Sequence, residues 1–298
     1  MNNHIPVLTN QLLQFLAPRE GQIFVDCTLG IGGHTKKISE ALNGTGAVYG
    51  IEVDERNLAL AKERLSAAKN IHFIHDNFEN LEAIGKEIIK KEGKIDGILF
   101  DLGLSSLHVD EASRGFSFQK DGPLDMRFDP RQTLTAADII NEYSQEKLTE
   151  IFTTYGEERF SNSIAAGIVD HRKRSRFTTT LQLANFIESC VGGGRGHAGP
   201  RIHPATRVFQ ALRIATNREI EVLHSALASA ISLLSQGGRI VVISYHSLED
   251  RLVKNMFRDA KKESILNVLT KKPIKPDVHE IASNRRSRSA CLRAAEKL

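Results

Sequence analysis

Short apolar runs alternate with helical patterns between residues 23 and 101, and this alternation constrains the fold more than any other feature. Strands are expected at 23–27, 47–53, 71–75 and 95–101. Between them, apolar residues at helical spacing predict helices at 35–42, 56–67 and 81–90. Strands and helices that alternate in this way form a parallel sheet through right-handed crossovers. We therefore predict an α/β fold whose ligand site lies beyond the carboxyl ends of the strands.

The alternation stops near residue 107 and resumes after Pro204. Between these points the pattern indicates helices and no good strand, with helices expected at 145–155, 162–170 and 180–189, and a glycine-rich loop at 192–199. After it come expected helices at 204–217, 219–235 and 248–261, and expected strands at 239–244 and 288–294. We predict one discontinuous sheet domain, residues 1–106 and 205–298, that carries a helical domain inserted at 107–204.

The turn after the first strand, residues 25–34, is dense in glycine. Because glycine lacks a Cβ, such a turn lets the backbone approach a nucleotide-like ligand closely. A dinucleotide site would need glycine or alanine three residues after Gly32, and that position is Thr35. Asp26, at the end of the strand, would repel a pyrophosphate and attract an ammonium or hydroxyl group. These features favour S-adenosylmethionine over a nicotinamide cofactor.

Polar groups follow the other strands as well. Glu52, which ends the second strand, can accept hydrogen bonds from both ribose hydroxyls of the cofactor. Phe78, after the third strand, can form a wall for adenine. Taken singly, Glu52 could serve as an N-terminal helix charge, Phe78 as a core residue and His34 as a surface histidine. Their joint position at strand ends favours a cofactor site that also contains Gly32 and Gly33.

Asp101 ends the fourth strand, where an acceptor base would meet the methyl group. Methyl transfer from a sulfonium needs in-line geometry more than acid–base help, because the cofactor is already activated. An exocyclic amine is a poor nucleophile, and a carboxylate that accepts its N–H bonds would raise its electron density. Asp101 can have this catalytic role or bind the cofactor, and the sequence leaves both open.

The net charge of +4 is unevenly distributed. Residues 251–298 contain thirteen Lys or Arg and five Asp or Glu, so the rest of the chain sums to −4. Arginine-rich segments at 171–176, 201–218 and 284–288 favour contact with RNA phosphate over a merely solvated surface. The candidate RNA-binding residues are Arg172, Arg174, Arg207, Arg213, Arg285, Arg286 and Arg288. With aromatic content of only 6%, a single base flipped into a pocket fits better than an extended stacking surface.

Cys27, Cys190 and Cys291 share no spacing typical of a zinc site, and their odd number disfavours a disulfide framework. No apolar run approaches the ~20 residues that cross a bilayer, and the polar N-terminus with Pro6 does not resemble a signal peptide. We therefore expect a cytoplasmic protein with no metal site and no membrane partner. The sequence does not indicate its oligomeric state.

Several blocks of the chain, in order, resemble the bacterial ribosomal RNA small subunit methyltransferase H (MraW) family. These blocks are 4–8 (HIPVL), 30–35 (GIGGHT), 96–103 (DGILFDLG), 114–118 (RGFSF), 121–127 (DGPLDMR), 155–160 (YGEERF), 203–207 (HPATR), 244–251 (SYHSLEDR) and 288–293. The resemblance covers nearly the whole chain. It implies a Rossmann-like methyltransferase sheet with an inserted helical domain, and methylation of N4 of a cytosine in the decoding region of 16S rRNA.

The resemblance also implies particular site residues. Cofactor contacts are expected at Gly32, Gly33, His34, Glu52, Phe78, Asp101 and His108, to which the strand-end argument adds Asp26. Family members usually have aspartate at position 52 and often glutamine at position 108, so Glu52 and His108 depart from that pattern. The target cytosine is expected near Asp101, Ser105, Tyr245 and His246, with 16S rRNA, in the assembled small subunit, as the partner.

The sequence also bears on three alternative functions. A DNA amino-methyltransferase commonly has Asp/Asn-Pro-Pro-aromatic after the fourth strand, and residues 101–104 contain no proline. A non-catalytic RNA-binding or ribosome-assembly factor that retains a cofactor pocket is a different class, and slow or absent turnover with tight RNA binding would favour it. A nicotinamide oxidoreductase is disfavoured by Thr35.

Overall fold

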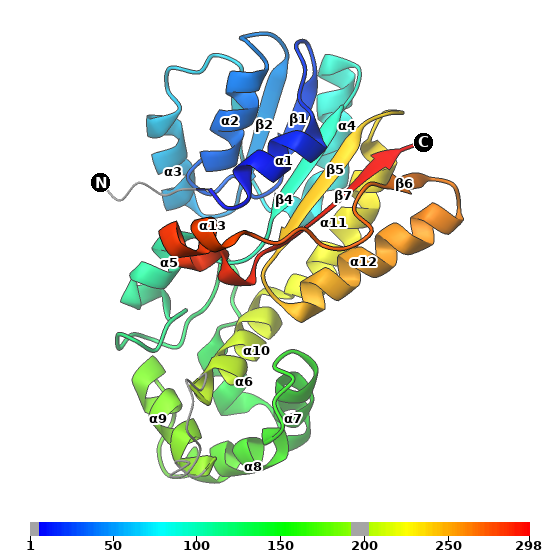
Figure 1. The fold of residues 1–298 in the computed structure, drawn as a ribbon. Helices are drawn as coiled ribbons and strands as arrows, with labels where there is room; N and C mark the ends of the chain where they lie inside the picture. The colour runs from blue at the N-terminus through cyan, green and yellow to red at the C-terminus, as the bar shows by residue number, and fades with distance from the viewer. Residues whose placement is uncertain (1–5, 192–202) are drawn as a thin grey trace. The chain divides into compact units, whose positions relative to one another are not determined.

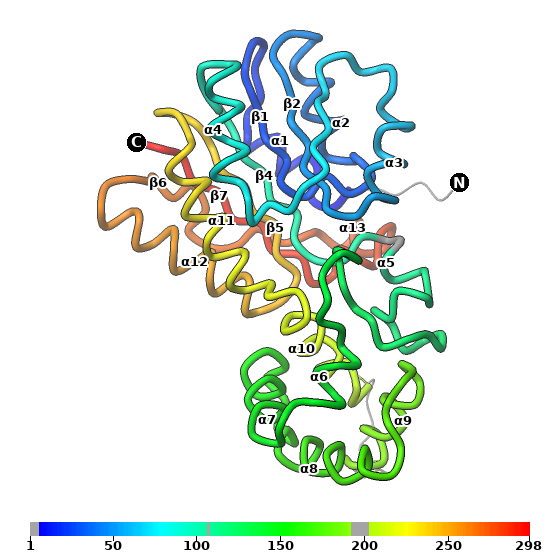
Figure 2. Tube along the Cα trace, turned by 180° about the vertical axis from the view of Figure 1, so that it is seen from behind, coloured from blue at the N-terminus to red at the C-terminus, as the bar shows by residue number. Residues whose placement is uncertain are grey.

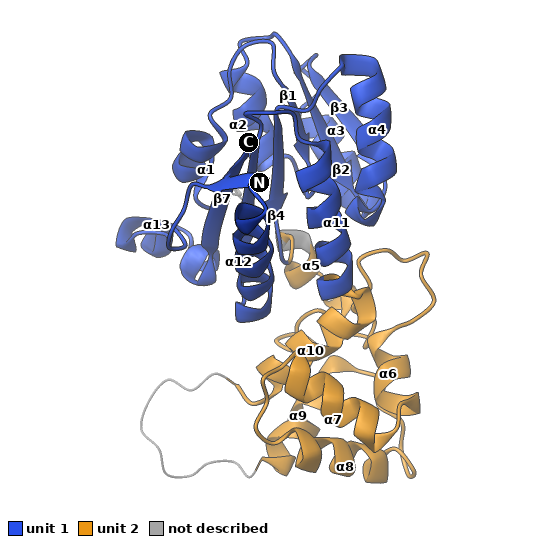
Figure 3. Cartoon of the chain, turned by 90° about the vertical axis from the view of Figure 1, so that its right-hand side faces the viewer, with its two compact units in different colours: residues 1–103, 220–298 blue, residues 104–219 orange. Residues whose placement is uncertain are grey.

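The computed structural model describes residues 6–191 and 203–298, and these fold into two compact units. Unit 1 contains the chain up to Gly103 and again from Ile220, and unit 2 contains residues 104–219 (Figure 3). Parts of the sequence discussed above lie outside the described residues: His4, Ile5, the glycine-rich loop at 192–199 and Arg201.

Unit 1 is built on a seven-stranded sheet in the order β3-β2-β1-β4-β5-β7-β6 (Figure 1). The strands are β1 (Ile23–Asp26), β2 (Ala47–Glu52), β3 (Ile71–His75), β4 (Gly97–Asp101), β5 (Arg239–Ser244), β6 (Leu266–Val268) and β7 (Cys291–Lys297). The strands from β3 to β5 are parallel, whereas β7 is antiparallel to both β5 and β6. The predicted Rossmann-like α/β fold is therefore confirmed, and both ends of the chain contribute to one sheet.

Successive strand residues face opposite sides of the sheet, and each side has its own helices. Phe24 and Leu99 pack with α1 (Thr9–Leu16) and α2 (Gly33–Ala41), the helices in front of the sheet in Figure 1. The opposite face packs against α4 (Leu81–Glu92), α11 (Glu219–Leu233) and α12 (Ser247–Lys262), of which α4 and α11 are in front in Figure 2.

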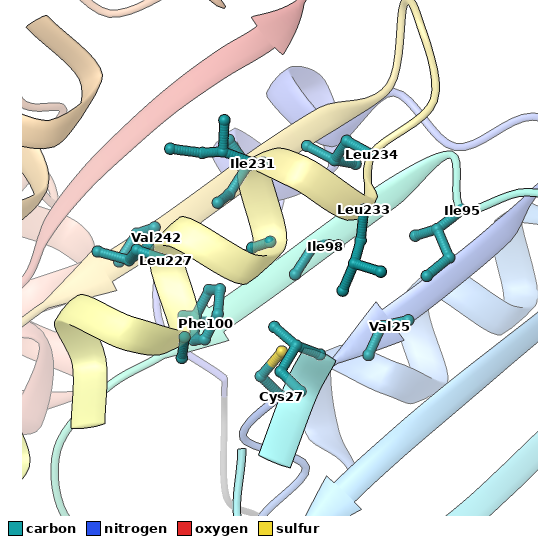
Figure 4. Close-up of a cluster of buried hydrophobic side chains, with 14 of the residues drawn as sticks. Val25, Cys27, Ile95, Ile98, Phe100, Leu227, Ile231, Leu233, Leu234 and Val242 are labelled. Carbon is teal, nitrogen blue, oxygen red and sulfur yellow. The ribbon is translucent and has the colours of Figure 1, made fainter. Parts of the chain in front are cut away.

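Figure 4 shows part of the cluster on the α11 side of the sheet, which contains Val25, Ile98 and Phe100 of neighbouring strands together with Leu227, Ile231 and Leu233 of α11. Each of these strand side chains is at most 1% exposed. Helices therefore pack against both faces of the central strands, so the residues at their carboxyl ends have a rigid base.

Several elements differ from the sequence prediction. Helices α1 and α13 (Val278–Ser283) and strand β6 were not predicted. The last strand begins at Cys291 rather than Arg288, because residues 285–289 form a 3₁₀ turn, η3. In that turn the Oγ of buried Ser287 donates to the carbonyl of Asn284.

Unit 2 is helical, apart from one isolated bridge between Pro123 and Thr179 among its described residues. Its elements are α5 (Ser106–Asp110), η2 (Ala112–Arg114), α6 (Ala136–Glu142), α7 (Gln145–Thr154), α8 (Ser161–His171), α9 (Thr180–Cys190) and α10 (Ala205–Asn217). The unit extends beyond the 204 boundary expected from sequence, since Val208 and Leu212 of α10 pack in the same core as Phe152 and Ile164. None of the described helices is long and apolar enough to span a membrane.

Candidate functional site

The carboxyl ends of β1, β2 and β4 bring three predicted site residues to one edge of the sheet. Asp26 pairs in register with Gly50 of β2 and with Leu99 of β4, so Glu52 and Asp101 extend beyond it by two residues each. The chain leaves β1 toward β2 and β3 and later returns to β4 on the other side of β1. This is the topological switch point at which open α/β sheets bind their ligands.

The glycine turn between β1 and α2 has left-handed backbone at Gly30 (φ +53°) and Gly32 (φ +81°). A Cβ on Gly32 would lie 2.4 Å from Leu65 Cδ1, and one on Gly33 would lie 2.9 Å from Pro6 Cγ. Around Gly30 the nearest such atom is the Thr28 carbonyl oxygen, at 3.9 Å. Gly32 and Gly33 are therefore required by packing inside unit 1, and Gly30 is the glycine that leaves space for a ligand.

We expect Gly32→Ala to destabilise the protein more than Gly30→Ala. Both substitutions force alanine into left-handed backbone, at about 1–2 kcal/mol. The alanine at 32 also overlaps Leu65, which adds about 1–3 kcal/mol of overpacking. Urea unfolding of the two variants measures the difference, and equal midpoints would contradict this account of the turn.

Asp26 is 1% exposed and both of its carboxylate oxygens have local partners. Thr35 Oγ1 donates to Oδ2 at 2.6 Å, and the Thr28 amide donates to Oδ1 at 3.1 Å. Burial raises the pKa of Asp26, and the hydrogen bond from Thr35 opposes this rise. Asp26 thus ties the start of α2 to the end of β1, and it supports the turn beneath the ligand site.

Thr28 and Thr35 were not singled out from sequence as contributors to the site. The sequence pattern gave Thr35 only one meaning, which is that it disfavours a dinucleotide site. Thr28 Oγ1 also accepts a hydrogen bond from the Asp101 amide at 2.6 Å, which joins β1 to β4 at the site. The sequence near Asp26 could have indicated both threonines, because a buried strand-end carboxylate needs hydrogen-bond donors and nearby hydroxyl groups can supply them.

Glu52 is 8% exposed and faces the glycine turn. Its Oε2 accepts from the Gly30 amide and its Oε1 from the Asp54 amide, both at 2.8 Å. Burial raises the pKa of Glu52 to about 7, against the lowering effect of these backbone hydrogen bonds. The Asn57 side chain also hydrogen-bonds to this carboxylate. As an acceptor-only group at the strand end, the ionised carboxylate fits the ribose hydroxyls predicted from sequence.

Phe78 begins the 3₁₀ turn η1 (Phe78–Asn80), which follows β3. Its ring is partly buried and meets Phe100 edge-to-face, with the centroids 5.8 Å apart. Phe78 therefore does pack against the core, which was the alternative role considered for it from the sequence. The part of the ring that stays exposed is the part that could contact adenine.

Asp101 is at the centre of a polar cluster at the end of β4. Tyr245 Oη donates to Asp101 Oδ1 at 2.8 Å, and His34 Nε2 lies 3.3 Å from Oδ2. Burial raises the pKa of Tyr245 well above its usual value, and the Asp101 charge raises it further. The Tyr245 hydroxyl therefore stays protonated at neutral pH and acts as a donor to Asp101.

His34 is 5% exposed, and both of its ring nitrogens are buried without a hydrogen-bond partner among the described residues. A buried polar atom of this kind is costly unless a ligand satisfies it. His34, the open side of Gly30 and the carboxylate of Glu52 together fit a ligand with several polar groups, as S-adenosylmethionine has.

His246 occupies the N-cap of α12. Its Nδ1 accepts from the Glu249 amide at 3.4 Å, while Glu249 Oε2 accepts from the amides of Tyr245 and His246 at 2.8 and 3.2 Å. This capping box fixes the backbone of Tyr245, and so it orients the ring that reaches Asp101.

Two predicted site residues, Ser105 and His108, belong to unit 2. Ser105 Oγ accepts from the His108 amide at 3.3 Å. The His108 ring is buried and tilted against Phe116 and Phe128, at 5.0 and 5.3 Å between centroids. Within unit 2, therefore, His108 is part of an aromatic cluster.

Some of the predicted RNA-binding arginines are held by contacts within the protein, whereas others have exposed side chains. In unit 2, Arg213 forms a bidentate pair with Glu219 at 2.7 and 2.8 Å, with both side chains 12% exposed. Arg172 donates to the Ile140 carbonyl at 2.7 Å. These contacts weigh against Arg213 and Arg172 as phosphate ligands. The others are exposed: Arg174 and Arg207 in unit 2, and Arg285, Arg286 and Arg288 in η3 of unit 1.

A family model described as the MraW methylase family matches residues 1–298. The chain belongs to the MraW methylase family. Among its relatives, the ribosomal RNA small subunit methyltransferase H of Halothermothrix orenii is 43% identical over 100% of this chain and 99% of its own. The protein of the same name from Dehalococcoides mccartyi is 46% identical over 99% of this chain and 86% of its own.

A solved rRNA methylase from Streptococcus thermophilus aligns with a TM-score of 0.45 at 14% identity, covering 97% of this chain and 93% of that one. The family resemblance expected from the sequence is confirmed by the family model. This MraW-family protein is a methyltransferase, and S-adenosylmethionine is its cofactor.

Proposed function

We propose that this MraW-family protein methylates the exocyclic N4 of a cytidine in the decoding region of 16S rRNA. Relatives named ribosomal RNA small subunit methyltransferase H, 43–46% identical over the whole chain, support the rRNA substrate. The observation that carries the reaction type is the Asp101 carboxylate, which Tyr245 holds at the end of β4 with the His34 ring beside it. An rRNA substrate also agrees with the expected cytoplasmic location.

S-adenosylmethionine supplies a methyl group on a positively charged sulfur, so the protein need not activate the leaving group further. The N4–methyl bond forms as the methyl–sulfur bond breaks, and N4 gives up one proton. Asp101 accepts an N–H bond from the amine, which orients its lone pair toward the methyl carbon and raises its electron density. The same carboxylate is the proposed acceptor of the proton.

Tyr245 keeps Asp101 in one orientation, and the His34 ring lies beside its other oxygen. Because the Tyr245 hydroxyl stays protonated, it donates to Oδ1 and does not compete with Asp101 for the amine proton. The Asp101 amide is fixed in turn by Thr28 Oγ1. The carboxylate is thus held through its backbone amide and through Oδ1 before the substrate arrives, which is how preorganised groups assist catalysis.

We expect Tyr245→Phe to lower kcat by at least about tenfold, because a hydrogen bond to a charged group is lost. The KM for S-adenosylmethionine should stay within about twofold, since no cofactor contact is assigned to the hydroxyl. The ring remains beside Gly103, where an added Cβ would lie 3.1 Å from Tyr245 Cδ2. Steady-state kinetics measure the two constants, and a raised KM with unchanged kcat would contradict the positioning role.

Unit 2 is the proposed RNA-recognition domain, as expected for the insertion at 107–204. Its exposed Arg174 and Arg207 and the three arginines of η3 are the proposed phosphate contacts. Arginine suits phosphate because its planar guanidinium donates two parallel hydrogen bonds. Since these residues come from both units, we propose the assembled small subunit, with its folded rRNA, as the substrate.

Transfer of a labelled methyl group tests the proposal. Purified protein with labelled S-adenosylmethionine should modify small ribosomal subunits that lack the modification, and should modify them faster than naked 16S rRNA or large subunits. Tight binding to small subunits without any transfer would favour the alternative, a non-catalytic ribosome-assembly factor that retains the cofactor site.

A further inference from the structure

The turn between α7 and α8, residues 155–160, coincides with one of the sequence blocks that resemble the MraW family. Glu157 has left-handed backbone, with φ +47°, and reverses the chain. Glu158 is 9% exposed, and its Oε1 accepts from the Phe160 amide at 2.9 Å. Ser161 Oγ donates to the Glu158 carbonyl at 2.6 Å. The backbone that carries Phe160 is therefore fixed by buried polar contacts.

The Phe160 side chain is nevertheless 45% exposed. In the described residues, it is the one aromatic side chain among the exposed large apolar groups, the others being Leu60, Leu181, Val278 and Leu298. A rigid backbone that presents an aromatic ring to solvent is a typical binding feature, because the ring is available without further ordering of the chain.

Two arginines accompany this ring. Arg159 precedes Phe160 and is exposed, with no hydrogen bond or ion pair to another described residue. Arg207 of α10 is also exposed, and its Nη1 donates to the Glu157 carbonyl at 3.2 Å. A Cβ on Gly156 would lie 2.8 Å from the Arg207 carbonyl oxygen, so the turn and α10 are in direct contact. The carboxylate of Glu158, by contrast, is turned inward.

We propose that Phe160 stacks on an unpaired base of the RNA substrate while Arg159 and Arg207 contact the adjacent phosphates. This rests on the proposed rRNA substrate and adds one specific contact to it. An aromatic face accepts any base, and flanking arginines suit the phosphates on either side. An apolar protein partner would use the ring but has no need of two cations beside it, so charge complementarity favours RNA.

The chain contains no tryptophan, so Phe160→Trp introduces a single fluorophore that keeps the stacking surface. Its fluorescence should be quenched on addition of a short single-stranded adenine oligonucleotide and restored by salt, because phosphate contacts weaken as ionic strength rises. Leu181→Trp, at another exposed apolar position of unit 2, is the matched control and should not respond. Equal responses of both variants, or none at Phe160→Trp, would overturn the proposal.

Binding to small ribosomal subunits gives a second test. Phe160→Ala should weaken binding by at least about fivefold, Phe160→Trp should retain it, and Leu60→Ala in unit 1 should leave it unchanged. Arg159→Gln should lower the slope of log K against log salt by about 0.7–0.9, the contribution of one phosphate. Weakened binding by Phe160→Ala with no oligonucleotide quenching at Phe160→Trp would identify a protein contact and overturn the RNA assignment.

The two proposals fail in different ways. If the wild-type protein transfers no methyl to rRNA, the proposed function fails whatever Phe160 does. If wild-type transfer is normal and Phe160→Ala changes neither its KM for subunits nor its subunit binding, only the stacking contact fails.

Discussion

Asp101→Asn is expected to lower the rate of methyl transfer by at least about 100-fold, the lower limit for loss of a positioned acid–base group. The amide can still accept from Tyr245 with its one oxygen. Its second terminus becomes an NH₂ group facing His34 and can accept neither the amine N–H bond nor the proton. Single-turnover kinetics with saturating cofactor measure this rate directly.

Affinity for S-adenosylmethionine should change by less than about fivefold in Asp101→Asn, because the ribose and the turn have other partners. Asp259→Asn is the matched control. Asp259 is an exposed carboxylate on α12, and Arg258 and Lys262 hold its pKa at about 2. Full turnover in Asp101→Asn with only cofactor affinity lost would mean that Asp101 binds the cofactor and takes no part in catalysis.

Cofactor affinity is expected to rise about tenfold between pH 6 and pH 8, because Glu52, with a pKa of about 7, must lose its proton to accept both ribose hydroxyls. A carboxylate with this pKa is about 10% ionised at pH 6 and about 90% at pH 8. Isothermal titration across this range measures the change, with the buffer ionisation enthalpy varied to count the protons released on binding.

Glu52→Gln separates this contribution from any titration of the cofactor itself. The variant should bind about 10- to 100-fold more weakly at pH 8, since charge-assisted bonds become neutral ones. Its affinity should lose the tenfold dependence on pH. If wild type and variant share the same pH profile, Glu52 is not the titrating ribose ligand.

The raised pKa of Glu52 also makes the free energy of unfolding depend on pH. The native pKa of Glu52 lies above the ordinary value of 4.5, so between about pH 4.5 and pH 7 the native state binds more protons than the unfolded state. The unfolding free energy contributed by this group therefore falls as the pH rises through that window and is constant above it. Bound cofactor should offset this fall in unfolding free energy, because its ribose hydroxyls would donate hydrogen bonds to the ionised Glu52.

The sheet could be predicted from the sequence because each apolar run ends at a polar strand-end residue, and the run at 71–75 matches β3 residue for residue. Helix α1 was missed although Leu12 and Leu16 are at helical spacing, and α6 although Thr135 and Asp138 form a capping box. Strand β6 has only three residues, and it exists because β7 pairs with it. Such pairing between distant segments leaves no local pattern.

The individual residues of the site could be predicted from the sequence, but the hydrogen bonds between them could not. Asp101 and Glu52 were found because strand ends of a parallel sheet meet at one edge. The bond from Tyr245 to Asp101 joins residues 144 positions apart, and no local pattern indicates it. The end of unit 2 was misplaced for a similar reason, because the amphipathic pattern of α10 does not show which of two cores its apolar face joins.

The most direct test of the proposed reaction is nucleoside mass spectrometry of 16S rRNA after the protein and S-adenosylmethionine have acted on small subunits that lack the modification. We predict N4-methylcytidine at a single site in the decoding region. A methyl group on carbon 5 of cytosine, or on a ribose, would contradict the assignment of Asp101 as the acceptor for an exocyclic amine.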